Sequence, residues 1–123
     1  MMTYLWIIGY VMAKPVNRSY SRYAREASEL LGALIHTARI ERDITVMELA
    51  ERAGVSRGLV QRIERGDTGC SIGAVFELAA IVGVRLFEDN PSALPRHLSA
   101  AREKLTLLPK SVRKSQIKVK DDF

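Results

Sequence analysis

The sequence contains few of the residues that form disulfide bonds in small proteins or bind metal ions. Its 123 residues include one cysteine, Cys70, and two histidines, His36 and His97. A single thiol excludes an internal disulfide, and no Cys/His cluster has the spacing of a structural zinc site. We therefore expect a reducing, cytoplasmic setting with no metal and no cofactor. Cys70 is expected to act as a small apolar filler and both histidines to lie on helix surfaces.

Long hydrophobic runs are also missing. The only strongly apolar stretch, MMTYLWIIGYVM at the start of the chain, falls well short of the about 20 residues that span a bilayer. No Lys or Arg precedes it, which disfavours a secretory signal. We expect no membrane contact and a natural start at Met12. The alternative is a short apolar arm that packs on a partner.

Patterns that carry catalysis are not found. The histidines have no Cys, Asp or Ser at a spacing that suggests a triad. The glycines at 66, 69 and 73 lack the strand and the lysine of a phosphate-binding loop. The sequence predicts no catalytic residue, and we expect no enzyme.

Charge is unevenly distributed along the chain. The total is +5, yet residues 26–89 carry a net charge of −4, whereas residues 1–25 carry +4 and residues 90–123 carry +5. A polyanionic partner would therefore be held by a few placed arginines in the centre, helped by the two ends.

Apolar residues at spacings of three and four predict an all-α protein with five helices. The first runs from about Ser21 to Arg42, and its predicted apolar stripe consists of Ala27, Leu30, Leu31, Leu34, Ile35 and Ala38. The next three are capped by Thr45, Ser56 and Ser71, and Gly54 makes the sharp turn between the second and third. The helix after Ser71 is apolar over nearly its whole circumference, so we expect it to be buried. A fifth amphipathic helix covers residues 92–108.

These elements divide the chain into four parts. Residues 1–20 form an N-terminal extension with a basic arm, and residues 21–90 form the main domain. Residues 91–108 form a C-terminal helix that makes a dimer or partner contact, and residues 109–123 form a basic tail that is flexible when unbound.

The segment TVMELAERAGVSRGLVQRIERG, residues 45–66, resembles the helix-turn-helix core of the λ-repressor/Cro-like (XRE) family. With its flanking helices the resemblance covers about residues 27–87. It implies a five-helix λ-repressor-like domain in which one helix enters the major groove of double-stranded DNA and a second crosses the backbone. The chain departs from the family at Val46, where many members have Gln.

The resemblance implies a DNA-binding site at the start of the third helix. Arg57 is the expected base reader, since its guanidinium can donate two hydrogen bonds to guanine, and Gln61 can pair with adenine. We expect Arg62 to contact a phosphate. The expected DNA-binding set is Thr45, Val46, Ser56, Arg57, Gly58, Gln61 and Arg62, in which Thr45 and Ser56 act mainly as caps and Gly58 reads no base.

The segments on either side of the motif narrow the choice of protein class. They resemble HipB-like antitoxins in the stretches RSYSRYAREASELLGALIHTARIERDIT and LTLLPKSVRKSQIKVKDDF. That resemblance implies a homodimer on an inverted-repeat operator that represses its own operon and holds a HipA-like serine/threonine kinase toxin. The tail would then dock on the kinase through Arg113, Lys114, Asp121, Asp122 and Phe123. The alternative for this tail is a solvated, frayed terminus.

Two other functions stay open. One is a free-standing repressor or phage-type regulator without a kinase partner. The other is a protein-interaction module that no longer reads DNA. The net negative charge of the central residues and the valine at position 46 are compatible with this alternative.

Overall fold

The computed structural model describes residues 19–87 and 90–114 of the chain. These residues form five α-helices and one short 3₁₀ turn, and they include no strand. The predicted all-α, five-helix fold is confirmed. The chain divides after Val84 into two compact units, each described here by itself. No helix within the described ranges is long and apolar enough to cross a membrane.

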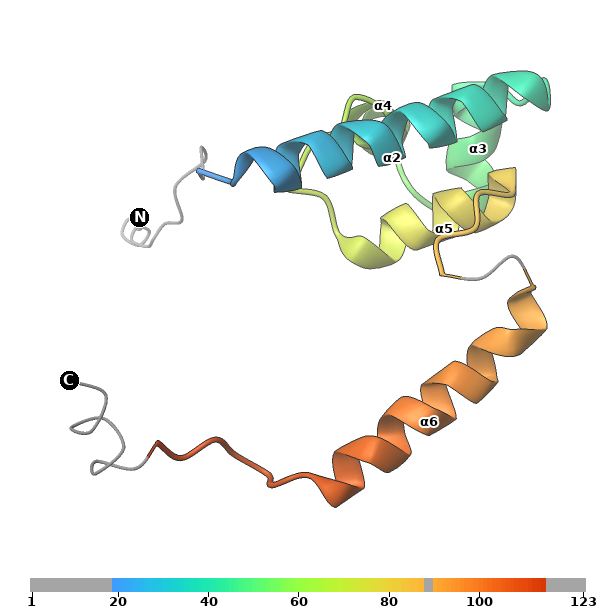
Figure 1. Ribbon diagram of the computed structural model, residues 1–123. Helices are drawn as coiled ribbons and strands as arrows, with labels where there is room; N and C mark the ends of the chain where they lie inside the picture. The colour runs from blue at the N-terminus through green and yellow to red at the C-terminus, as the bar shows by residue number, and fades with distance from the viewer. Residues whose placement is uncertain (1–18, 88–89, 115–123) are drawn as a thin grey trace, which may run out of the picture. The chain divides into compact units, whose positions relative to one another are not determined.

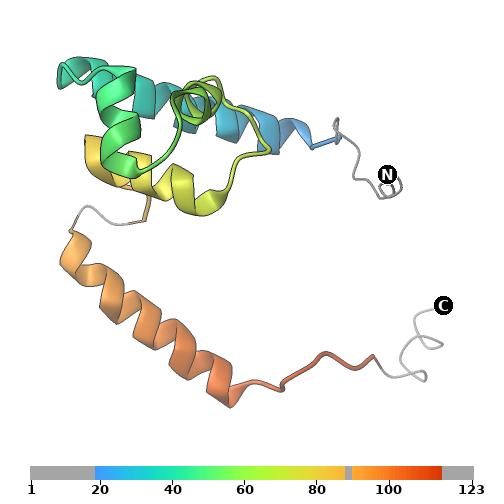
Figure 2. The same ribbon diagram turned by 180° about the vertical axis from the view of Figure 1, so that it is seen from behind.

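The first unit is built on a long helix, α2 (Arg22–Glu41), as Figures 1 and 2 show. It packs on α4 (Arg57–Glu64) and α5 (Ile72–Val82), and α3 (Val46–Ala53) packs on the same two helices. The core therefore lies among four helices. Its largest fully buried side chains are Ile35, Leu49, Val60, Leu78 and Val82.

Helix α2 begins where the sequence predicts, because the Ser21 hydroxyl accepts a hydrogen bond from the amide of Ala24 (3.1 Å). Its apolar stripe differs from the expectation. Ile35 and Ala38 are buried, but Leu30 is 61% exposed and Leu34 is exposed as well. The buried side of the helix is rotated toward Gly32 and Arg39.

That rotation has a steric cause at Gly32. A Cβ at this position would overlap the carbonyl oxygen of Ile63 and lie 2.9 Å from that of Glu64. The missing side chain thus lets the end of α4 approach the backbone of α2. Gly66 makes a second close approach: its φ is +85°, and a Cβ there would lie 2.7 Å from the Cα of Glu29.

Helix α5 is less buried than its composition suggests. The Ser71 hydroxyl caps it as expected, and it ends at Gly83. Leu78, Ala79 and Val82 are buried, but Ile72 is 72% exposed. The expectation of burial around nearly the whole helix was wrong, because only the side toward α2 and α3 has packing partners in this unit.

The second unit contains a 3₁₀ turn (Pro91–Ala93) that leads into α6 (Leu94–Leu107), the fifth predicted helix. The side chain of Asn90 accepts hydrogen bonds from the amide and the hydroxyl of Ser92, which fixes the entry to this turn. No residue of α6 is buried.

Candidate nucleic-acid interface

Helices α3 and α4 form a helix-turn-helix with a short, tightly specified turn. Gly54 ends α3 with φ +71° and ψ +31°, a left-handed conformation that glycine adopts at low cost. The amide of Val55 then donates to the carbonyl of Ala50 (3.0 Å). Ser56 opens α4 directly afterwards. Three residues thus turn the chain between the two helices.

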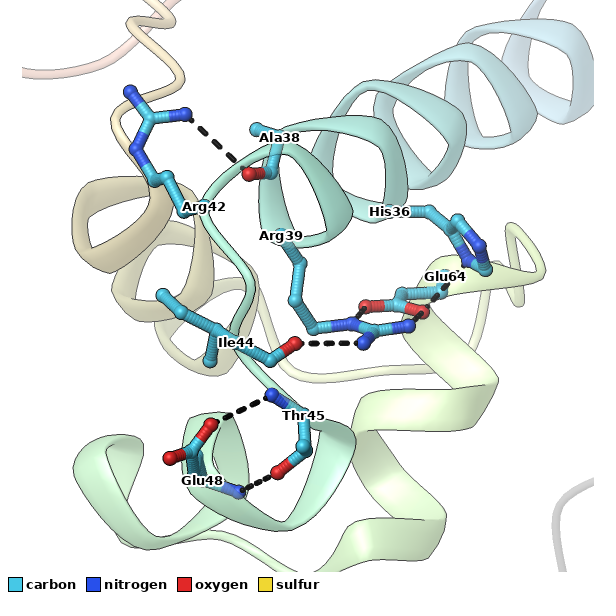
Figure 3. A network of polar contacts seen from close by, with 8 residues as sticks. All are labelled: His36, Ala38, Arg39, Arg42, Ile44, Thr45, Glu48 and Glu64. Atoms are coloured by element: carbon cyan, nitrogen blue, oxygen red, sulfur yellow. Dashed lines mark hydrogen bonds and ion pairs between the residues drawn. The ribbon is translucent and has the colours of Figure 1, made fainter.

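Thr45 and Ser56 are helix caps in this structure. The Thr45 hydroxyl accepts from the amide of Glu48 (3.0 Å), and the Glu48 carboxylate accepts from the amide of Thr45 (2.8 Å), so that both halves of a capping box are present (Figure 3). Ser56 accepts from the amide of Leu59 (3.1 Å). Both side chains hold helix ends in place, as the sequence suggested.

The first two turns of α4 present a polar face to solvent. Arg57, Gly58 and Gln61 are all exposed. Arg57 and Gln61 are four residues apart, so their side chains lie on the same side of the helix. A Cβ built on Gly58 would have only the Ser56 hydroxyl within 4 Å, at 3.9 Å, so the surface there is open backbone. A bare patch between two long polar side chains allows close approach to a ligand.

Arg62 is held in place by an ion pair. Its Nε donates to Oδ2 of Asp67 (2.8 Å), and Oδ1 of Asp67 accepts from the amide of Gly69 (2.7 Å). The hydrogen bond from Arg62 lowers the pKa of Asp67, and the same bond raises the pKa of Arg62. The guanidinium stays partly exposed, so its remaining N–H groups can still donate to an anion.

Val46, the first residue of α3, is half-buried and packs against the core. It therefore offers no polar side chain to a ligand. Its amide belongs to the first turn of the helix, where N–H groups have no intrahelical acceptor and the helix dipole favours anions.

The end of α4 is fixed by a polar lock made of Arg39, Glu64 and His36 (Figure 3). Arg39 donates from Nε to Oε2 of Glu64 (2.6 Å) and from its second terminal nitrogen to Oε1 (3.1 Å). The Nδ1 of His36 lies 2.8 Å from the same Oε1. This lock joins α2 to α4.

Arg39 also reaches the start of α3. Its other terminal nitrogen donates to the carbonyl of Ile44 (2.9 Å), one residue before the Thr45 cap. Because the Arg39 and Glu64 side chains are only 10% and 5% exposed, the pair is largely shielded from water. One guanidinium thus sets both helices of the motif against α2.

Sequence reasoning missed this lock. His36 is on the surface, as expected, but it is a partner of Glu64 rather than an isolated side chain. The available signal was a charged residue at position 39, four residues after Ile35 on a buried stripe. Such a residue needs a partner of opposite charge.

The remaining predicted positions lie outside this surface. Arg113 and Lys114 are exposed residues of the second unit. The predicted partner contacts at Asp121, Asp122 and Phe123 lie outside the described residues. Cys70 is half-buried, and burial raises the pKa of its thiol. Within the described ranges no group of three or more His, Cys, Asp or Glu residues could hold a metal ion.

Comparison with known proteins identifies the same segment. Residues 30–86 match the family model of a helix-turn-helix domain, which is consistent with the XRE-like resemblance of the sequence. No curated protein and no solved structure shows significant similarity to the chain. The match supports a DNA-binding regulator, and domains of this kind are typically not enzymes.

Proposed function

We propose that the helix-turn-helix in residues 30–86 reads a specific DNA sequence and that the chain represses transcription from that site. The observation that carries the proposal is the pair Arg57 and Gln61, exposed on one face of α4, in its first and second turns. A helix of this motif enters the major groove with its N-terminal residues toward the base edges. Arg57 would read guanine and Gln61 adenine through paired hydrogen bonds.

Contacts to DNA phosphates would position the start of α4 against the bases. The amides of Val46 and Met47 at the start of α3 are not used by the Thr45–Glu48 capping box, so they can donate to a phosphate although Val46 supplies no side-chain donor. Arg62, pre-oriented by Asp67, is placed to add a charged contact. Thr45 and Ser56 contribute by holding the two helix starts.

The DNA site would be an inverted repeat bound by a homodimer. One recognition helix covers too few base pairs for useful specificity, whereas a two-fold dimer reads half-sites about 34–36 Å apart. The exposed leucines of α6 give the chain apolar surface for such an assembly.

The narrower proposal is an antitoxin that represses its own operon and binds a HipA-like kinase. It rests on the HipB-like resemblance of the segments around the motif. The tail, including Arg113 and Lys114, would contact the kinase. A free-standing repressor without a kinase partner is the second candidate, because it needs only the helix-turn-helix.

The test is affinity capture of the tagged full chain from its host, with and without nuclease, followed by mass spectrometry and sequencing of bound DNA. Enrichment of one promoter supports the repressor, and a kinase that stays bound after nuclease treatment supports the antitoxin. Promoter DNA without a kinase favours the free-standing repressor. If no DNA sequence is enriched, the proposal of sequence-specific DNA binding is wrong, and a protein-interaction module is the remaining function.

A further inference from the structure

Helix α6 carries an apolar stripe with the spacing of a coiled-coil seam. Leu94, Leu98, Ala101 and Leu105 follow one another at intervals of four, three and four residues. This spacing keeps the side chains on one face of a helix. No residue of α6 is buried, and Leu105 is 68% exposed. An apolar partner is therefore needed to remove this stripe from contact with water.

Helix α2 presents a second stripe with the same spacing. Tyr23, Ala27, Leu30 and Leu34 are again separated by four, three and four residues. All four are exposed, because the buried side of α2 faces α4 and α5 through other residues. Ala27, Leu30 and Leu34 belong to the apolar stripe that the sequence predicted for this helix, and Tyr23 extends it by one turn.

The charges beside the two stripes differ in sign. Arg102 directly follows Ala101 of the α6 stripe, and Lys104 directly precedes Leu105. The two basic residues therefore lie on opposite edges of the stripe. Two α6 stripes packed together would bring these basic side chains close to one another, which is unfavourable. The α2 stripe instead has an acid, Glu26, on its edge, and this carboxylate also pairs with Arg22.

From these stripes we infer that α6 of one copy docks on the α2 stripe of a second copy, and that the second copy returns the same contact. This inference rests on the proposed operator-binding dimer. A single helix-on-helix seam is small against the about 1,000 Å² that a specific interface needs, whereas reciprocal docking doubles the buried area and closes the dimer. The occupant of each stripe is therefore another copy of this chain.

Two double variants of the full chain test the arrangement by sedimentation equilibrium. Leu98→Asp with Leu105→Asp damages the α6 stripe, and Leu30→Asp with Leu34→Asp damages the α2 stripe. Each variant alone should dimerise at least about 100-fold more weakly, because charged side chains would be forced into both apolar seams. An equal mixture of the two should form a heterodimer more strongly than either variant dimerises alone, since one intact α6 can still meet one intact α2. It should still associate more weakly than the unmodified chain, because the second seam is lost.

Matched controls separate docking from misfolding. Leu107→Asp changes another exposed leucine of α6, and Ile40→Asp changes another exposed residue of α2, both off the stripes. Both controls should dimerise like the unmodified chain. All variants change exposed side chains, so each should keep the helical circular-dichroism spectrum.

A charge reversal distinguishes the two kinds of seam. Arg102→Glu with Lys104→Glu would replace the basic edges of α6 by acids that face the Glu26 edge of the α2 stripe, so dimerisation should weaken about tenfold or more at low salt. A seam between two α6 helices would keep like charges on both sides and would not weaken.

The outcomes also separate this inference from the proposed function. If the α2 double variant dimerises normally while the α6 variant does not, or if the mixture associates no more strongly than either variant alone, the reciprocal docking is wrong although the operator-binding dimer stands. If the unmodified chain stays monomeric even on an inverted-repeat operator, the dimer of the proposed function is itself wrong and the inference falls with it.

Discussion

Arg39 and Glu64 lie 25 residues apart in the chain and meet in a largely buried, two-point ion pair, with 2.6 Å between Nε and Oε2. The pair joins the middle of the long helix to the last residue of the helix proposed to read DNA. Because Arg39 also donates to the carbonyl of Ile44, one side chain links α2 both to the end of α4 and to the residue before the Thr45 cap of α3.

Removing one partner of this pair should destabilise the fold strongly. Glu64→Gln leaves the Arg39 charge without a full counter-charge in a shielded place, and Arg39→Met leaves the Glu64 carboxylate with only His36 as a side-chain partner. For each we expect a loss of about 3–5 kcal/mol in the free energy of unfolding, measured by urea denaturation.

The exposed pair between Arg22 and Glu26 provides the control. Its side chains are largely in water, so Arg22→Met should change stability by no more than about 0.5 kcal/mol. An Arg39→Met variant as stable as this control would show that the buried lock contributes nothing net to folding.

Gly32→Ala should destabilise the first unit by about 1–3 kcal/mol, because the added methyl group would meet the backbone carbonyls of Ile63 and Glu64 rather than a movable side chain. Thermal unfolding followed by circular dichroism measures this. Gly73→Ala on α5 is the matched control: nothing lies within 4 Å of the new methyl group, and the change should be neutral or slightly stabilising. Equal effects at the two glycines would contradict the close contact at Gly32.

Local sequence patterns predicted the helices well because their signals are short-range. Ser21, Thr45, Ser56 and Ser71 each cap a helix a few residues away, and Gly54 makes its turn from its own backbone preference. The candidate site residues Arg57 and Gln61 came from the resemblance to the λ-repressor/Cro-like family, and their role stays a prediction. The positions of helices relative to one another were not predictable this way.

The missed features all depend on contacts between distant parts of the chain. Leu30 and Leu34 fit an apolar stripe, but Gly32 and Arg39 turn α2 toward α4 through partners at positions 63 and 64. A period of three and four residues identifies an apolar face. It does not say which of two adjacent faces the tertiary structure covers.

The Asp67 carboxylate should make stability depend on pH on the acid side. Its pKa is below the ordinary 3.8, first because of the hydrogen bond from Arg62 and second because of the amide of Gly69. A depressed pKa contributes stability above the unfolded-state pKa and loses it as the pH falls through the folded-state pKa. Asp67→Asn should therefore differ most from the unmodified chain near pH 6, and the difference should shrink below about pH 4.

Nuclear magnetic resonance titration of the Asp67 carboxyl carbon provides the direct measurement. Arg62→Gln should move the titration midpoint upward, toward the ordinary value, since it removes the first cause of the shift. A midpoint that stays unchanged in Arg62→Gln would mean that the ion pair does not form in solution.

Arg57→Ala tests the assignment of base reading within the helix-turn-helix. If Arg57 donates two hydrogen bonds to a guanine, its loss should weaken binding to the selected operator by about 1–3 kcal/mol and leave binding to unrelated DNA nearly unchanged. Fluorescence anisotropy at several salt concentrations measures both affinities. Arg62→Ala is the comparison on the same helix, because a phosphate contact should weaken both DNAs alike and reduce the salt slope by about one. If Arg57→Ala weakens both DNAs equally, Arg57 binds the backbone instead, and the specificity of this surface must come from Gln61 or from the shape of the DNA.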